Sequence, residues 1–207
     1  SKRPVNVSCE TLTGRFKTMY THRIMGASEQ RRLKNHLNRG GVIAYACEAC
    51  FGLGCLPNNQ RALRRVMAIK QRPQSKGLIV IGDSLARLKP LLKPLTAAQT
   101  EQVNQAWPAA KTFIIRSSDK VSPLLRGNGR NKLAVRVPAH DDARLLSKLA
   151  ASPLVSTSCN RSGKRFCTTT REVKRQFGRQ VMVVTGRIGS NKQPSQIYDL
   201  DSGRRLR

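Results

Sequence analysis

Aromatic and acidic side chains are both scarce in this chain of 207 residues. Phe, Trp and Tyr make up 4% of it, and 11 Asp and Glu accompany 39 Lys and Arg, which gives a formal net charge of +28. A helix that binds a lipid surface carries aromatic and leucine residues opposite its basic face, so this shortage argues against a membrane partner. The excess of positive charge instead predicts a polyanionic partner, and the usual one is nucleic acid.

Long apolar runs are missing as well. No stretch is long enough to span a bilayer, and the first residues lack the apolar core of a secretory signal. We therefore expect a protein of the cytoplasm or of an organelle matrix that is not secreted. In such a reducing compartment the six cysteines are expected to be mostly thiols. The 39% of hydrophobic residues are concentrated in runs that can form a buried sheet, which excludes a wholly disordered polycation.

The chain is predicted to consist of a basic extension, residues 1–27, and one domain, residues 28–207. The extension shows little periodicity and contains Lys2, Arg3, Arg15 and Lys17. Two interpretations stay open: a disordered tail, or an arm that becomes ordered on the phosphate backbone of RNA. RNA contacts are also expected from the first helix of the domain, whose polar side includes Arg31, Arg32 and Lys34.

Apolar periodicity predicts helices and strands that mix without strict alternation. Ser28 and Thr170 are expected to cap helices. Helices are predicted over residues 28–39, from 58 or 59 to 70, and over 84–92, 96–106, 141–150 and 170–178. Strands are predicted over residues 42–45, 78–81, 112–115, 133–137, 154–158, 181–184 and 197–200. The fold class is therefore α/β, a twisted mixed open sheet flanked by helices in a single domain.

Two polar segments, far apart in sequence, each follow a predicted helix or strand. Lys70 and Arg72 end one helix, while Ser158 and Asn160 end one strand. Exposed ends of elements are where α/β proteins build ligand sites. The two cations and the two hydrogen-bonding side chains together predict an anionic ligand.

Several longer motifs occur in an order that resembles the YrdC/TsaC family. The resemblance covers residues 28 to about 203 and rests on residues 45–55 (YACEACFGLGC), 70–73 (KQRP), 76–80 (KGLIV), 133–140 (LAVRVPAH), 156–163 (STSCNRSG) and 194–199 (PSQIYD). It implies an L-threonylcarbamoyladenylate synthase, which joins L-threonine, bicarbonate and ATP with Mg²⁺ and releases pyrophosphate. The product serves the threonylcarbamoyladenosine modification of tRNA.

The resemblance also implies residue roles. Lys70 and Arg72 match the family's Lys-x-Arg and would hold nucleotide phosphates. Ser158 and Asn160 match its Ser-x-Asn and would bind substrate and nucleotide. Arg136 would pair with the threonine carboxylate. Gly52 and Gly54 would let the backbone approach the ligand closely.

Ordinary structural roles are the alternative for the same residues. Lys70 and Arg72 are also typical of solvated charges at a helix end, where the helix dipole favours cations. Ser158 and Asn160 are also typical of loop residues that satisfy backbone groups. Arg136, in an apolar strand, is compatible with a simple salt bridge.

The sequence departs from the family pattern around the expected pocket. Ala46 and Cys47 replace the family's Pro-Thr, Ala109 and Ala110 follow Trp107-Pro108 in place of Gly-Pro, and Cys159 replaces an alanine. Leu56 stands where Asp is common, and Lys132 where a small hydroxyl residue is common. These changes motivate a second hypothesis, that a former synthase now serves as an RNA-binding component of a ribonucleoprotein such as an organellar ribosome.

The cysteines suggest one further site. Cys47 and Cys50 have metal-ligand spacing, the family resemblance would bring Cys159 near them, and Cys55 or Cys167 would be needed to complete a set. Buried structural thiols beside a glycine-rich segment are the stronger interpretation, so no metal cluster is expected.

Overall fold

Side chains of the first strand point alternately to the two faces of the sheet, and each face is covered. The computed structural model describes residues 25–191 and 193–207. Ile43 and Tyr45 of β1 (Ile43–Ala46) belong to a smaller core that also contains residues of α1 and α6. Val42 and Ala44 belong to a larger core with residues of α2, α4, α5 and α7. The near-continuous burial of residues 42–46 is what a strand covered on both faces requires.

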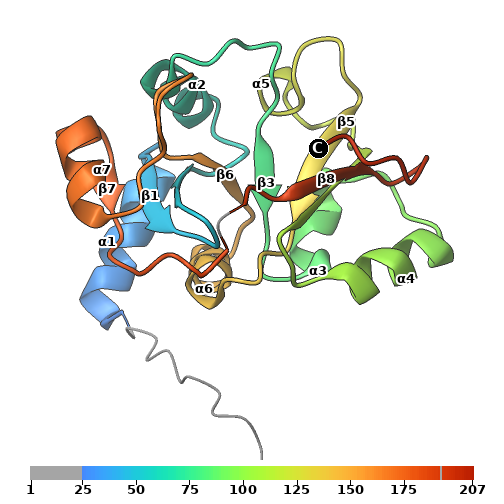
Figure 1. Ribbon diagram of the computed structural model, residues 1–207, viewed down its shortest axis with the longest axis horizontal. Helices are drawn as coiled ribbons and strands as arrows, with labels where there is room; N and C mark the ends of the chain where they lie inside the picture. The colour runs from blue at the N-terminus through green and yellow to red at the C-terminus, as the bar shows by residue number, and fades with distance from the viewer. Residues whose placement is uncertain (1–24, 192) are drawn as a thin grey trace, which may run out of the picture.

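The strands of the described residues form one open, mixed sheet in the order β7-β1-β2-β6-β3-β5-β4-β8. Figure 1 shows β6 and β3 near the middle of the molecule. The strands after β1 are β2 (Phe51–Gly54), β3 (Ile79–Ile81), β4 (Lys111–Arg116), β5 (Lys132–Arg136), β6 (Leu154–Ser158), β7 (Met182–Val183) and β8 (Gln196–Asp199). β6 lies in the middle and pairs antiparallel with both β2 and β3. β3 and β5 are parallel, as are β4 and β8, and β1 and β7. The α/β mixed open sheet expected from the sequence is confirmed.

Helices cover the two faces unequally. α1 contacts α6 on the side of the smaller core, and α2 contacts α5 on the other side. The helices are α1 (Ala27–Asn38), α2 (Gln60–Lys70), α3 (Leu85–Leu88), α4 (Ala97–Ala106), α5 (Pro123–Arg126), α6 (Asp141–Ala150) and α7 (Thr170–Phe177), with 3-10 turns η1 (Lys89–Leu91) and η2 (Gly178–Gln180). The predicted helices 84–92 and 96–106 correspond to α3 with η1, and to α4.

The two ends of α2 determine where the candidate site residue Lys70 lies. Asn59 caps the helix, because its Oδ1 accepts a hydrogen bond from the Ala62 amide at 2.9 Å. Gln71, with φ 51°, adopts the left-handed conformation and ends it. Lys70 is therefore the last helical residue, and its side chain is directed toward the end of β6.

Two predicted helix caps are wrong by one or two residues. α1 begins at Ala27 with Gly26 as its N-cap, not Ser28, because the Gly26 amide donates to Glu29 Oε2. Thr169, not Thr170, caps α7, since its hydroxyl accepts from the Glu172 amide. Lys2, Arg3, Arg15 and Lys17, which the sequence analysis predicts to contact RNA, lie outside the described residues. In the described part of the chain, no helix has the length and apolar character to cross a bilayer.

Candidate functional site

One sheet face carries several predicted site residues. Strand register pairs Gly52 with Ser158, and Ile81 with both Leu154 and Arg136. Because side chains alternate along a strand, Ser158 and Arg136 therefore point to the same side of the sheet. The packing of α1 and α6 covers Ile81 and Leu154 on this face. Gly52 and Ser156 lie on the same face, where the Tyr45 ring packs against them.

Lys70 joins the two polar segments that the sequence separates by almost ninety residues. Its Nζ donates to the main-chain oxygens of Ser158 at 2.5 Å and Asn160 at 3.0 Å, and to Asn160 Oδ1 at 2.7 Å. Ser158 Oγ is a fourth, longer neighbour at 3.5 Å and itself donates to Asn160 Oδ1 at 2.9 Å. The structure thus brings Lys70, Ser158 and Asn160 together in a single hydrogen-bonded group.

Burial disfavours the charged form of the Lys70 side chain. Removal from solvent, together with the nearby Arg72, lowers the pKa of the Lys70 ammonium to about 8. An anion bound beside Lys70 Nζ would raise this pKa again, because an opposite charge favours the charged ammonium. The group therefore suits a negatively charged ligand better than a neutral one.

Arg72 lies beside this group but is held differently. Its Nε and Nη2 donate to the carbonyls of Lys76 at 3.0 Å and Gly77 at 2.8 Å, which fixes the guanidinium on the loop that leads into β3. Burial, then Arg130 and Arg207, lowers the pKa of Arg72. Burial, and then Arg136, likewise lowers the pKa of Arg207. These arginines repel one another, and a bound anion would relieve that repulsion.

Arg136 is buried at the end of β5 with one nitrogen unsatisfied. Its Nη2 lies 3.4 Å from Glu48 Oε2 and 3.7 Å from Cys47 Sγ. Among the described residues, its Nε has no hydrogen-bond partner. Leaving a buried donor unpaired is unfavourable, so this nitrogen is a place where a ligand oxygen would be stabilised.

Glu48 is a site residue whose contacts the sequence did not predict. Its Oε2 accepts the Cys47 thiol at 2.7 Å and its Oε1 accepts the Ala139 amide at 3.1 Å. Burial raises the pKa of Cys47, which keeps it a neutral donor. The Gly189 amide donates to Cys47 O at 2.9 Å, so the segment after β7 also passes over this corner. These contacts join residues about ninety and 140 positions apart, a distance over which one sequence carries no pairing signal.

Gly52 and Gly54 lie in β2, which the sequence did not reveal as a strand. A Cβ at Gly54 would stand 2.7 Å from Val155 O and 2.8 Å from Tyr45 Cε1. At Gly52 it would meet Ser156 Oγ at 3.4 Å. Tight packing against the neighbouring strands and the tyrosine ring therefore accounts for Gly54, and the ligand-contact role of both glycines stays a prediction.

Two surface cavities lie apart from the Lys70 group. One of about 920 Å³ is formed by α2 and α5 and includes Arg72. The other, about 710 Å³, lies against α1 and β7. Neither is lined by Lys70, Ser158 or Asn160. Lys70, Ser158 and Asn160 thus contact one another directly, whereas Arg72 lines a cavity to which those three side chains do not contribute.

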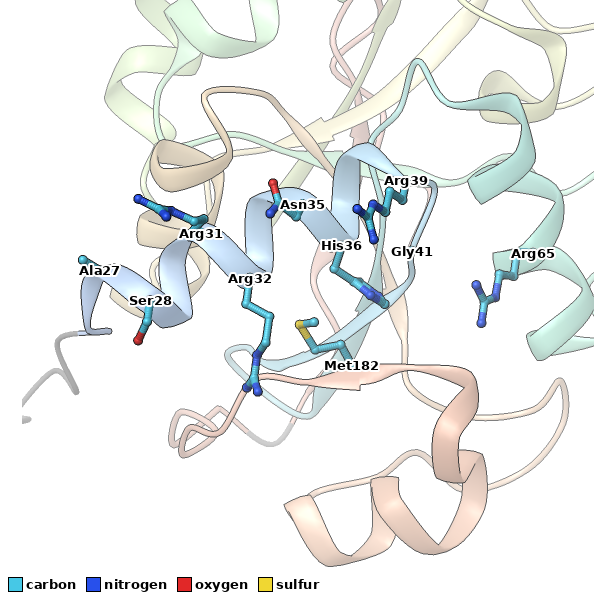
Figure 2. A pocket seen from close by; sticks show the side chains of 10 residues that line it. All are labelled: Ala27, Ser28, Arg31, Arg32, Asn35, His36, Arg39, Gly41, Arg65 and Met182. Atoms are coloured by element: carbon cyan, nitrogen blue, oxygen red, sulfur yellow. The ribbon is translucent and has the colours of Figure 1, made fainter.

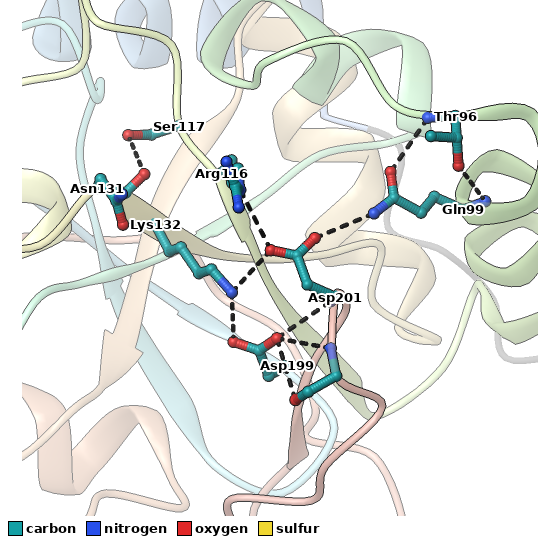
Figure 3. Close-up of polar contacts among 9 residues, drawn as sticks. Thr96, Gln99, Arg116, Ser117, Asn131, Lys132, Asp199 and Asp201 are labelled. Atoms are coloured by element: carbon teal, nitrogen blue, oxygen red, sulfur yellow. Dashed lines mark hydrogen bonds and ion pairs between the residues drawn. The ribbon is translucent and has the colours of Figure 1, made fainter.

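The structure accommodates the departures from the family pattern. Cys47 supplies a donor in place of the usual hydroxyl, and Cys159 is fully buried. Ala109 and Ala110 do not have the positive φ that would demand glycine. Leu56 packs on the smaller core. Lys132 binds two carboxylates, Asp199 Oδ2 at 2.7 Å and Asp201 Oδ2 at 2.8 Å, as Figure 3 shows.

Metal ligands do not gather around the cysteines. Cys47, Cys50, Cys55, Cys159 and Cys167 are free thiols. Within residues 25–191 and 193–207, no three His, Cys, Asp or Glu side chains are placed to hold a metal ion. A Mg²⁺ ion at this site would depend on oxygen ligands from substrate phosphates, as is common for that ion.

Sequence comparison places these residues in a known family. The Sua5/YciO/YrdC family model, described as telomere recombination, matches residues 35–207. The threonylcarbamoyl-AMP synthase of Neisseria gonorrhoeae is 54% identical over 190 residues, which cover 91% of this chain and 100% of that protein. Its namesake in Neisseria meningitidis serogroup A is 53% identical over 185 residues, covering 89% and 98%.

Solved structures agree on the fold. Sua5 of P. abyssi, solved with L-threonine, superposes with a TM-score of 0.78 at 27% identity, covering 84% of this chain and 51% of Sua5. A double variant of the same protein gives a TM-score of 0.79, with coverage of 85% and 54%. The chain thus spans about half the length of Sua5. Escherichia coli YciO, at 24% identity and a TM-score of 0.71, covering 82% and 84%, shares the fold.

Proposed function

Because the chain belongs to the Sua5/YciO/YrdC family, we propose that it is a threonylcarbamoyl-AMP synthase that joins L-threonine, bicarbonate and ATP and releases pyrophosphate. The observation that carries this proposal is the contact of Lys70 with Ser158 and Asn160, next to Arg72. Curated relatives covered over nearly their whole length have this activity in their names. The product would serve tRNA modification.

Phosphoryl chemistry explains why cations are needed here. In the proposed reaction the amine of L-threonine and bicarbonate combine, with loss of water, to give a carbamate. The carbamate carboxylate attacks the α-phosphate of ATP, and the bond from the α-phosphate to pyrophosphate breaks, so that pyrophosphate departs with additional negative charge. Fixed positive groups lower the barrier because they stabilise that charge without having to reorganise. Lys70 has four oxygen neighbours for three hydrogens, so the 3.5 Å contact with Ser158 Oγ is the one that a phosphate oxygen replaces most easily. Ser158 and Asn160 then orient the nucleotide.

Arg136 is proposed to hold the carboxylate of L-threonine. Its guanidinium is buried, oriented by Glu48 and unsatisfied at Nε. A carboxylate oxygen would give that donor its partner through a charge-assisted bond. The complex of the related Sua5 with L-threonine supports the choice of amino acid.

RNA association is a separate part of the proposal. The net charge of +28 is more than a small soluble enzyme needs, and it favours contact with tRNA. The same charge motivated the alternative of a catalytically decayed component of an RNA particle. The relatives named above are synthases, so the comparisons give that alternative no support.

The decisive test is pyrophosphate release from ATP and bicarbonate, measured with and without L-threonine. We expect threonine-dependent release from the unaltered protein. Lys70→Ala should reduce turnover by about 10²- to 10³-fold, the usual effect of removing one stabilising electrostatic group. Lys76→Ala removes the same charge from an exposed side chain six residues away and is expected to remain active.

Circular dichroism and thermal unfolding would establish that both variants are folded. A folded, unaltered protein that releases no pyrophosphate would refute the synthase proposal. Full activity of folded Lys70→Ala would refute the assigned role of Lys70.

A further inference from the structure

A basic cavity of about 710 Å³ lies at the edge of the sheet, away from the Lys70 group. It is formed by α1, the start of the following segment, α2 and the edge strand β7. Figure 2 shows its lining, which consists of Ala27, Ser28, Arg31, Arg32, Asn35, His36, Arg39, Gly41, Arg65 and Met182. None of these residues belongs to the proposed synthase site.

Arginines surround this cavity without acidic partners. Arg32 on α1 and Arg39, its C-cap residue, are seven residues apart and lie two turns apart along one side, while Arg31 is offset by about 100° around the helix. Arg65 lies across the hollow on α2. The cavity lining contains no Asp or Glu among its described residues.

The α1 arginines are available for a ligand. Arg31, Arg32 and Arg39 are exposed, and among the described residues their guanidinium groups form no hydrogen bond or ion pair. Arg65 is anchored by one bond from Nη2 to Gln180 O at 3.1 Å, which leaves its other donors open. Guanidinium groups this numerous repel one another unless an anion lies between them.

The base of the cavity is held in place by hydrogen bonding and close packing. His36 Nε2 donates to Val42 O at 3.0 Å, and the ring packs against Gly41, where a Cβ would come within 2.2 Å of His36 Cδ2. Met182 of β7 completes the floor. The arginines are thus displayed over a fixed surface, which favours contact with a rigid, repeating charge pattern.

We propose that this cavity binds the phosphodiester backbone of RNA, as a docking surface separate from the synthase site. The lining has no Phe, Tyr or Trp on which a base would stack, so the described residues favour phosphates over bases. The arginines are spread along a helix rather than converging on one point, which suits an extended polyanion better than a single nucleotide. The inference shares its RNA partner with the proposed function but does not require catalysis.

Two other occupants fit the charge less well. Residues 1–24 contain five Lys and Arg against one Glu, so the chain's own extension has the same sign as the cavity. An acidic protein surface has the right sign, but carboxylates match the guanidinium pattern no better than phosphates, and a polyglutamate competitor separates the two cases.

The test is RNA binding by fluorescence anisotropy, using labelled in vitro transcribed tRNA over a range of salt concentrations. The variant replaces all four arginines with glutamine: R31Q, R32Q, R39Q and R65Q. We expect at least about a tenfold loss of affinity at 0.1 M salt, and a fall of about 3 in the slope of log affinity against log salt, because each lost phosphate contact removes about 0.7 to 0.9.

A matched control removes four exposed charges elsewhere: K89Q, K120Q, K148Q and R204Q. It should lose distinctly less affinity and keep more of the slope. Equal losses in the two variants would overturn the proposal, and so would polyglutamate that competes as well as RNA at equal charge. Pyrophosphate release should be unchanged in the cavity variant. An inactive unaltered protein whose RNA binding still depends on the four arginines would refute the synthase proposal and leave this one standing.

Discussion

Lys70 is the residue on which the site depends, and it serves two purposes at once. Its ammonium holds the end of β6 in place through the Ser158 and Asn160 oxygens. The same buried charge is available to an anionic ligand. The sequence predicted the association of these residues, but not that the lysine would already be surrounded by oxygens before any ligand binds.

ATP binding should therefore depend on pH. Burial lowers the pKa of Lys70 to about 8, so the free protein loses this charge as pH rises through that value. Bound phosphate raises the pKa again, so binding takes up a proton. Between pH 7 and pH 9 we expect the dissociation constant for ATP to rise by about tenfold, as linkage requires.

Isothermal titration calorimetry at pH 8.5, in two buffers with different ionisation enthalpies, measures the proton uptake directly. The Lys76→Ala protein should behave like the unaltered chain. Binding without proton uptake, and with constant affinity across this range, would contradict the assignment.

At the scale of the elements, Lys132, one of the departures from the family pattern, helps to hold the end of β8 in place. Lys132 of β5 binds Asp199 and Asp201, while Asp201 also accepts from Gln99 Nε2 at 3.1 Å and pairs with Arg116 Nε at 3.4 Å (Figure 3). The end of β8 is thereby fastened to β5, β4 and α4. Hydrogen bonding to Lys132 lowers the pKa of Asp201.

Lys132→Met should destabilise the protein by about 1–2 kcal/mol, because two neighbouring carboxylates lose a shared cation in a partly exposed setting. The lowered carboxylate pKa means that this stabilisation is present above the ordinary pKa of Asp and is lost as pH falls through the lower, folded-state value. Urea unfolding at pH 7 and pH 3 measures the difference, which should shrink at pH 3. Lys120→Met is the exposed control, and equal stability of the two variants at pH 7 would contradict the expectation.

Periodicity predicted most of the elements but missed two. β2 reads as a glycine loop because Gly52 and Gly54 disfavour strands, yet pairing with β1 and β6 and the Tyr45 ring require small residues there. α5 has a single turn, too short for a helical period. Lys70, Ser158 and Asn160 were found through residue type and family motif. The contacts of Glu48 with Ala139 and of Lys132 with Asp199 were not predicted, because these partners are distant in sequence and are brought close by the fold.

For the whole molecule, charge is the dominant property. With +28 on 207 residues, the folded state suffers self-repulsion that the few carboxylates offset only locally. The arginine-lined cavity and the arginines beside Arg72 are two places where this repulsion is concentrated.

Raising sodium chloride from 50 to 500 mM should accordingly raise the melting temperature. Screening worth about 1 kcal/mol corresponds to about 2–4 °C for a chain of this size. Differential scanning calorimetry is the measurement. The melting temperature of Lys132→Met should rise more with salt than that of the unaltered protein. The reason is that the variant lacks a favourable ion pair, which salt would weaken in the unaltered protein. A melting temperature that falls with salt would contradict the expectation.

The central position of β6 has a consequence for how the chain is made. β1 and β2 form one partial sheet, β3, β5 and β4 form another, and β6 (residues 154–158) is the described strand that pairs with both. During translation, more than seventy residues are synthesised between the end of β3 and the start of β6. Until β6 is made, the edges of β2 and β3 that will pair with it have no partner strand. Two unpaired strand edges are exposed during that interval, which makes the newly synthesised N-terminal half a natural client for molecular chaperones.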